Sequence, residues 1–279
     1  MHRIRVAHSP DSDDAFMYFG IASGAVRAEG IAFEQALLDV ESANQAGAEG
    51  YDVTAISAAA YPFLAQGYLL LDSGASMGDG YGPLVVVPQS SSFTSLSELS
   101  GRRVAVPGRR TSAALALSLE VTRFEPVPMD FRAAGAAAQR GEVEAALIIH
   151  EGQLTVAEEG LRVLADLGQR WKERTALPLP LGLNAIRRDL PAGVRSAVAR
   201  AWGESISYGL AHRAEALTYA LSFARGLSRR QADRYVGMYV NDWTVELGSR
   251  GREAVAAFLG TAFDRGLLPR VPLEYQERG

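Results

Sequence analysis

Cysteine is absent from the 279 residues of this chain. Its absence excludes disulfides, thiol nucleophiles, iron–sulfur clusters and cysteine-based zinc sites, and it is typical of a cytoplasmic protein. No apolar run reaches the roughly 18 residues that a membrane span needs, and the start MHRIRVAHSPDSDDAF has no apolar leader segment. Long basic runs are also lacking and the formal net charge is −4, so neither a membrane nor nucleic acid is an expected partner.

The chain contains the proportion of hydrophobic residues that is usual for a globular protein. Short apolar runs alternate along it with helical patterns. Strands are predicted at 4–8, 31–38, 53–57, 68–71, 84–87, 104–106, 127–131 and 145–149. Helices are predicted at 13–22, which Ser12 can cap, and at 40–49, 58–65, 111–121 and 133–140. From Ala192 onward the pattern is helical.

Two stretches interrupt the alternation and read as crossings between domains. The first is the serine-rich segment 88–93, and the second is the proline-rich segment 177–182. The two halves of the chain have a similar order of elements. In each half a helix ends at a glycine, Gly50 or Gly141, and is followed by a strand that ends at a polar residue, Ser57 or His150. We therefore predict an α/β protein with a ligand cleft between two lobes: 1–88 plus 181–279, with a helical tail, and 89–180.

The segment Ala145–Glu151 is the strongest candidate for chemistry. Its apolar run predicts a buried strand that ends at His150, and ligands of open α/β sheets bind beyond the carboxyl ends of strands. A histidine there can move a proton near neutral pH. The alternative is a core histidine bonded to a backbone carbonyl. Glu151 either orients His150 or begins the next helix, and we favour the second interpretation.

A second candidate is the turn Pro107–Ser112. Gly108 permits a tight passage from strand to helix, and Thr111 and Ser112 then stand where backbone N–H groups can hold an anion. A carboxylate suits this turn better than a nucleotide, because no phosphate-binding loop pattern is present. Thr111 or Ser112 can equally be a helix cap, and the two roles are compatible.

Two further segments end strands of the first lobe. Ser57 follows Ala55 and Ile56, and small residues after it leave room for a ligand; a helix cap is the alternative. In the turn after the first strand, Ser9 and Asp14 can reach polar groups of a ligand.

The three acids of that turn, Asp11, Asp13 and Asp14, lack the spacing of a calcium loop, so we predict no metal. His8 is a weaker candidate base than His150, while His2 and His212 are expected to be structural or solvent-facing. No nucleophile elbow, dinucleotide signature or zincin motif is present, which leaves proton-transfer chemistry or simple binding.

Several segments together resemble the 1,4-dihydroxy-6-naphthoate synthase family of the futalosine route to menaquinone. They cover nearly the whole chain: SPDSDDAFMYFG from Ser9, DVESAN from Asp39, GPLVVV from Gly82, VAVPGRRTSA from Val104, GEVEAALIIHE from Gly141, RTALPLPLG from Arg174 and YVNDW from Tyr239.

The resemblance implies a two-lobed fold like that of type II periplasmic binding proteins, and a cytoplasmic lyase without an organic cofactor. It implies conversion of cyclic dehypoxanthine futalosine, a carboxylate, to 1,4-dihydroxy-6-naphthoate and dihydroxyacetone. The general base of the family falls on His150, and its substrate contacts fall on Ala55–Ser57 and Thr111–Ser112. Ser112 replaces a threonine of some relatives, and Asp13 stands where relatives can carry asparagine.

Two alternatives remain at this point. Chorismate dehydratase, a sister family with the same fold, is expected to carry Gly-Asp where this chain has His150-Glu151. A solute-binding protein of a transport system would need an export signal or lipid anchor, which this sequence does not show.

Overall fold

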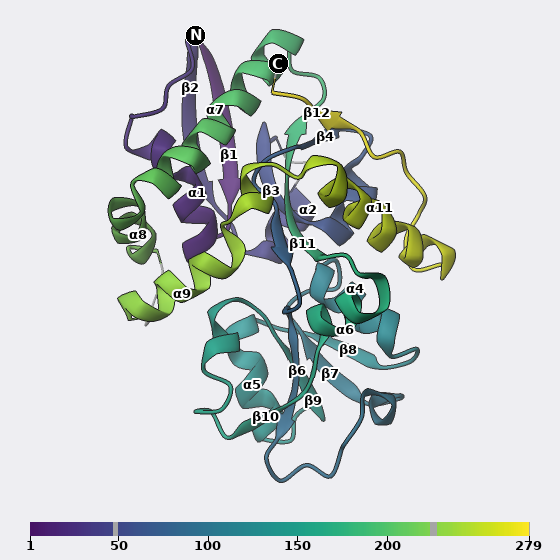
Figure 1. Ribbon diagram of the computed structural model, residues 1–279. Helices are drawn as coiled ribbons and strands as arrows, with labels where there is room; N and C mark the ends of the chain where they lie inside the picture. The colour runs from purple at the N-terminus through teal and green to yellow at the C-terminus, as the bar shows by residue number, and fades with distance from the viewer. Residues whose placement is uncertain (47–49, 224–227, 279) are drawn as a thin grey trace. The chain divides into compact units, whose positions relative to one another are not determined.

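The computed structural model describes residues 1–46, 50–223 and 228–278, and it divides the chain into two compact units (Figure 1). The first unit comprises Met1–Met77 and Pro180–Gly279, and the second comprises Gly78–Leu179. Both are α/β, with one sheet each. Among the described residues, no helix has both the length and the apolar character that crossing a lipid bilayer requires.

The first unit is built on a mixed sheet with the strand order β12-β4-β11-β3-β1-β2, and β5 pairs with β11. β1 runs parallel to both β2 and β3, so these strands end at the same edge of the sheet. Its strands are β1 (His2–His8), β2 (Ile31–Leu37), β3 (Val53–Ser57), β4 (Tyr68–Leu71), β5 (Ser76–Gly78), β11 (Leu179–Arg187) and β12 (Tyr275–Gln276).

Helices α1, α7 and α8 of this unit lie side by side and share a core with the sheet (Figure 1). α1 and α7 approach closely, because a Cβ on Gly20 would stand 2.7 Å from the Cα of Ser205. The helices are α1 (Ser12–Ala22), α2 (Val40–Ala46), η1 (Ala58–Ala60), α3 (Tyr61–Leu64), α7 (Ala192–Ala211), α8 (Arg213–Leu221), α9 (Arg229–Tyr239), α10 (Asp242–Val245) and α11 (Gly248–Asp264).

The second unit has a sheet with the order β10-β6-β9-β7-β8. β7 is parallel to β8 and β9, whereas β6 is antiparallel to β9 and β10. The elements are β6 (Leu84–Pro88), η2 (Leu96–Leu99), β7 (Arg103–Val106), α4 (Ser112–Glu120), β8 (Glu125–Pro128), α5 (Phe131–Gln139), β9 (Ala145–Ile148), η3 (His150–Leu154), β10 (Leu161–Asp166) and α6 (Leu167–Thr175).

One of the two predicted boundaries differs from the structure. We placed the first crossing after Pro88, but β6 pairs with β9 and β10 and so belongs to the second sheet. The chain instead passes between units at Met77–Gly78. The second crossing was predicted correctly, since the chain returns to the first unit between Leu179 and Pro180, inside the segment 177–182. β11 begins in this segment at Leu179 and pairs with β3 from Gly182 onward.

Two local predictions were also wrong. Asp11, rather than Ser12, precedes the first turn of α1 as its N-cap. The predicted strand 127–131 ends at Pro128, and Phe131 instead begins α5. The sequence pattern also gave no sign of β5, β10 or α6. The end of the predicted helix 40–49 lies outside the described residues, and α2 is described from Val40 to Ala46.

Candidate functional site

His150 stands immediately after the buried strand β9 (Ala145–Ile148) and opens the short helix η3. Its backbone is left-handed, with a φ of 54°, a region that residues other than glycine rarely occupy. The imidazole is half-buried and packs on Phe131, with 4.7 Å between the ring centroids and 57° between the ring planes. A backbone held in an unfavourable region is a common feature of functional positions.

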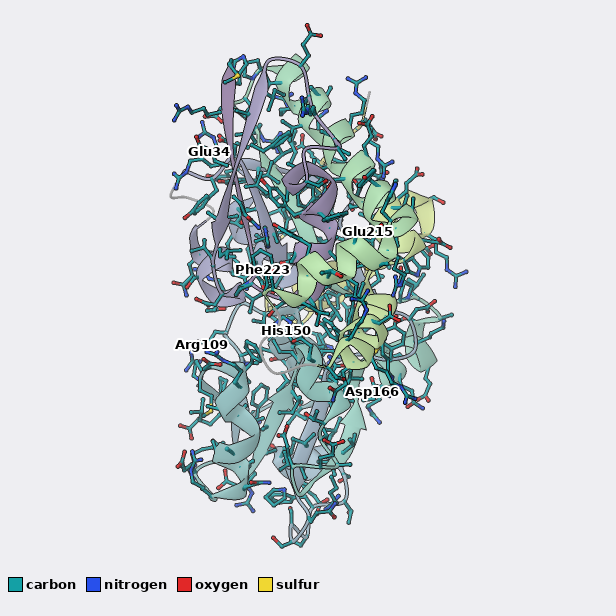
Figure 2. The ribbon with its side chains drawn as sticks, turned by 90° about the vertical axis from the view of Figure 1, so that its left-hand side faces the viewer. Glu34, Arg109, His150, Asp166, Glu215 and Phe223 are labelled. Carbon is teal, nitrogen blue, oxygen red and sulfur yellow. The ribbon has the colours of Figure 1, made fainter. Side chains whose placement is uncertain are left out.

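The turn that carries Thr111 and Ser112 lies at the same edge of the sheet as His150. β7 and β9 are parallel neighbours, with Val104 opposite Ala145, so the turn after β7 and the turn after β9 leave the sheet on one side. Figure 2 shows Arg109, in the first of these turns, and His150 at the same end of the second unit. Two of the predicted site segments are therefore brought together by the topology of this unit.

Thr111 is the N-cap of α4. Its Oγ1 accepts a hydrogen bond from Ala114 N at 3.2 Å and donates one to Gly108 O at 2.9 Å. Thr111 and Ser112 are both buried. The capping role that we gave as the alternative is confirmed, and it is compatible with anion binding, because the backbone N–H groups of the first turn point out of the helix.

Ser57 ends β3 and is held by a buried asparagine. Asn44 Nδ2 donates to Ser57 Oγ at 3.1 Å, and Ser57 N donates to Asn44 Oδ1 at 2.7 Å. Asn44 is fully buried in α2. The predicted contacts Ala55 and Ile56 precede Ser57 on the same strand, and Ile56 is buried while Ala55 is half-buried. In the sequence, Asn44 belongs to the DVESAN segment, and its role as a partner of Ser57 is visible only in the structure.

Ser9 and Asp14 meet in the turn after β1, at the sheet edge where β3 also ends. Ser9 N donates to Asp14 Oδ2 at 2.9 Å, and Ser9 Oγ donates to the Asp11 carboxylate. Burial, followed by the nearby negative charge of Asp11, raises the pKa of the Asp14 carboxyl to about 7. Asp14 can therefore be protonated near neutral pH, which an ordinary aspartate cannot.

His8 is built into the core of the first unit. Its Nδ1 lies 2.7 Å from Ser9 O, an acceptor, so Nδ1 carries the hydrogen; Nε2, 2.7 Å from the Gln35 amide nitrogen, then accepts. Burial lowers the pKa of this imidazole, which favours the neutral form. A buried imidazole whose two nitrogens both form hydrogen bonds is a poor base, so His8 is a weaker candidate base than His150 in the structure as well.

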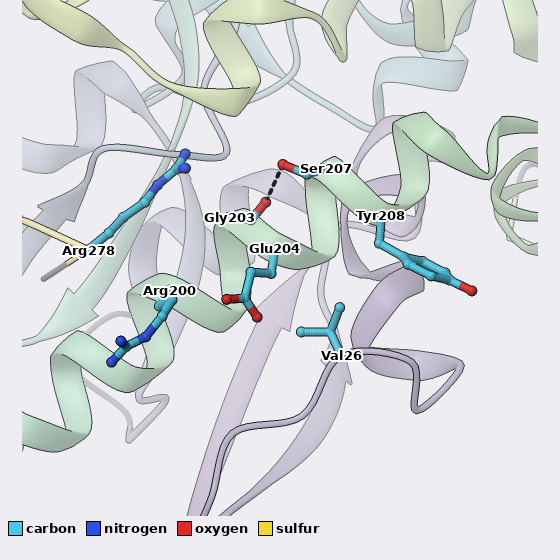
Figure 3. Close-up of a pocket in the computed structure, with 7 residues that line it drawn as sticks. All are labelled: Val26, Arg200, Gly203, Glu204, Ser207, Tyr208 and Arg278. Carbon is cyan, nitrogen blue, oxygen red and sulfur yellow. Dashed lines mark hydrogen bonds between the residues drawn. The ribbon is translucent and has the colours of Figure 1, made fainter.

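A pocket of about 640 Å³ opens on the surface of the first unit, along α7 (Figure 3). Exposed side chains of both charge signs, Arg200 and Glu204, line it next to Tyr208 and Arg278. Ser207 Oγ donates to Gly203 O at 2.9 Å within its wall. None of the predicted site residues lines this pocket.

Comparisons with known proteins place the chain in a family. A family model described as menaquinone biosynthesis matches residues 4–264. The curated 1,4-dihydroxy-6-naphthoate synthase of Thermus thermophilus is 40% identical over 273 residues, which cover 98% of each chain. The curated synthase of Streptomyces coelicolor is 32% identical, and the match covers 95% of each chain.

Solved structures agree with this placement. A crystal structure of an Archaeoglobus fulgidus protein is 46% identical, with a TM-score of 0.90 over 96% of this chain and 99% of that one. The alkanesulfonate-binding protein of Xanthomonas axonopodis is 16% identical, with a TM-score of 0.71 over 96% and 94% of the two chains, which shows a shared periplasmic-binding-protein-like fold. The chain thus has a two-lobed fold of this class and belongs to the menaquinone biosynthesis family, with relatives named 1,4-dihydroxy-6-naphthoate synthase.

Proposed function

We propose that the protein is a carbon–carbon lyase that converts cyclic dehypoxanthine futalosine to 1,4-dihydroxy-6-naphthoate and dihydroxyacetone. The observation that carries this proposal is the near full-length match to two curated relatives that bear the name of this synthase. The position of His150 beyond a buried strand supports it, because the reaction needs a group that can accept a proton near neutral pH.

In the proposed reaction His150 acts as the general base. It removes a proton from the sugar-derived part of the substrate, and the electron pair left behind drives cleavage of the carbon–carbon bond that releases dihydroxyacetone. The new ring gains aromatic stabilisation, which favours the forward direction. The proton resides on the imidazole during this step and has to be given up before the next turnover.

The remaining predicted residues bind the substrate in this proposal. The N-terminal turn of α4, with Thr111 and Ser112, supplies N–H groups for the substrate carboxylate. Ser57 has its backbone N–H and its hydroxyl fixed by Asn44, so it presents a defined contact together with Ala55 and Ile56. The polar groups of Ser9 and Asp14 complete the set. We predict no metal and no organic cofactor, and a cytoplasmic location follows from the resemblance alone.

The test is incubation of the purified protein with cyclic dehypoxanthine futalosine, with the naphthoate product followed by absorbance and mass. We expect product from the wild type, and a rate at least 100-fold lower for His150→Ala, since general-base catalysis contributes about 10²–10⁴-fold. His212→Ala is a matched control, because His212 is exposed at the end of α7 and stacks on Tyr208.

Two results would contradict the proposal. Retained activity in His150→Ala would remove His150 from the mechanism. Absence of product from the wild type, under conditions in which a known synthase works, would remove the synthase assignment. Chorismate supplied in the same assay would then distinguish a dehydratase, which consumes it, from a protein that only binds a solute.

A further inference from the structure

The direction of the His150 side chain is set by a backbone conformation that few residues adopt. With a φ of 54°, His150 departs from the extended path of β9, whereas the preceding residue Ile149 is still extended at a φ of −124°. This change in direction turns the Cα–Cβ bond away from the line that a continued strand would give it. The backbone alone does not fix the ring, however, since rotation about the two side-chain torsions remains.

Phe131 provides a contact that can restrict this rotation. Its ring centroid lies 4.7 Å from that of the imidazole, at the short end of the range in which aromatic pairs attract, and the two ring planes are tilted by 57°. Both residues are half-buried. Phe131 is neither part of the predicted substrate contacts nor able to transfer a proton.

The backbone on both sides of Phe131 is fixed at the start of α5. Asp130 is the N-cap, and its carboxylate accepts from Arg132 N at 3.0 Å and from the Arg132 guanidinium, whose hydrogen bond lowers the pKa of Asp130 to about 2. Met129 N donates to Val106 O at 3.0 Å, which ties the preceding residues to β7. Buried alanines of α5 pack with Ile148 of β9 in one core cluster.

We propose that Phe131 is a positioning residue that holds the His150 imidazole in the orientation its role as general base requires. This inference rests on the proposed function. It predicts that loss of the aromatic ring lowers the rate of the chemical step and leaves substrate affinity nearly unchanged, because a ring free to rotate meets the substrate proton less often in the right geometry.

The first experiment compares steady-state kinetics of the wild type with Phe131→Leu and Phe131→Tyr. We expect kcat to fall about 10- to 100-fold in Phe131→Leu, the range that misplacement of a catalytic group produces, with KM within about twofold. Phe131→Tyr keeps the ring and should retain kcat within about threefold. Phe93→Leu is the matched control, because Phe93 is also half-buried in the second unit and packs on Arg102 instead.

Proton NMR of the imidazole ring measures the contact without substrate. Because the chain has only four histidines, the His150 resonance is identified by its loss in His150→Ala. We expect a ring-current displacement of the His150 ring protons in the wild type and in Phe131→Tyr, and its loss in Phe131→Leu. If Phe131→Leu does not give a folded spectrum, Phe131→Met takes its place in both measurements.

The outcomes separate the two proposals. A wild type that shows the ring-current displacement but no turnover would overturn the proposed function and this inference with it. Normal turnover in the wild type with an unchanged kcat in Phe131→Leu would overturn the inference alone. A loss confined to KM, or a Phe131→Tyr variant as slow as Phe131→Leu, would also refute a positioning role for the aromatic ring.

Discussion

The left-handed backbone at His150 leads to a prediction about stability that is independent of any substrate. We expect His150→Gly to be more stable than His150→Ala, although glycine normally destabilises a folded protein relative to alanine. Both variants lack the imidazole, so the contacts of that side chain are lost equally and cancel in the comparison. What remains is the preference of the two residues for a φ of 54°.

The size of the difference can be estimated. A residue with a Cβ costs about 1–2 kcal/mol in the left-handed region, and glycine avoids this cost. Glycine in turn gives the unfolded chain more freedom, which costs about 0.4–1 kcal/mol. The net advantage of His150→Gly over His150→Ala in the free energy of unfolding is therefore about 0.8 kcal/mol, within a range of about 0–1.6 kcal/mol.

Urea unfolding at a single pH measures this difference, and neighbouring positions provide controls. Glu151 follows His150 in η3 and does not have a positive φ, so Glu151→Gly should be less stable than Glu151→Ala, by about 0.5–1 kcal/mol. Ala176, at the end of α6, has a φ of 59°, and Ala176→Gly should be stabilising like the change at 150. A His150→Gly variant less stable than His150→Ala would refute the reasoning.

Two other predictions concern the first unit. Because the folded-state pKa of Asp14 is raised from 3.8 to about 7, the folded protein binds more protons than the unfolded chain in this interval, and its stability falls as the pH rises through it. Asp14→Asn should flatten that slope in urea unfolding measured at several pH values, and an identical slope would contradict the assignment. Urea unfolding should also show that Gly20→Ala costs about 1–3 kcal/mol, because its Cβ would stand 2.7 Å from the Cα of Ser205. Gly193→Ala, in the open first turn of α7, should be neutral or stabilising in the same assay.

The parts of the fold that the sequence predicted well are strands whose signal is local. The prediction for β3, Val53–Ser57, agrees with the structure at both ends, and that for β9 differs by one residue. Both are short, mostly apolar runs with a polar residue at the end (Ser57) or two residues beyond it (His150), and burial on both faces of a sheet favours apolar runs of this kind. The cap at Thr111 is local as well, since it follows from one hydroxyl placed before a helical run.

The features that the sequence did not predict depend mainly on contacts between residues that are far apart in the sequence. The apolar residues from Val127 to Phe131 read as one strand, but Pro128 ends it, and the Asp130 cap starts a helix at Phe131. The contact of Phe131 with His150 joins residues 19 positions apart. The pairing of Asn44 with Ser57 likewise requires α2 and β3 to be packed together before it exists. The residue pattern within a single segment therefore does not predict contacts of this kind between segments.

The backbone conformation at position 150 bears on which residue type is favoured there. A φ of 54° is freely available to glycine, so a protein selected for stability alone would carry glycine after β9. This chain carries histidine instead and accepts a cost of about 1–2 kcal/mol. Strain of this size is common at functional positions, and the proton transfer that we propose for this imidazole is a function that glycine cannot perform. His150→Gly should therefore give a protein that is at least as stable as His150→Ala and equally inactive.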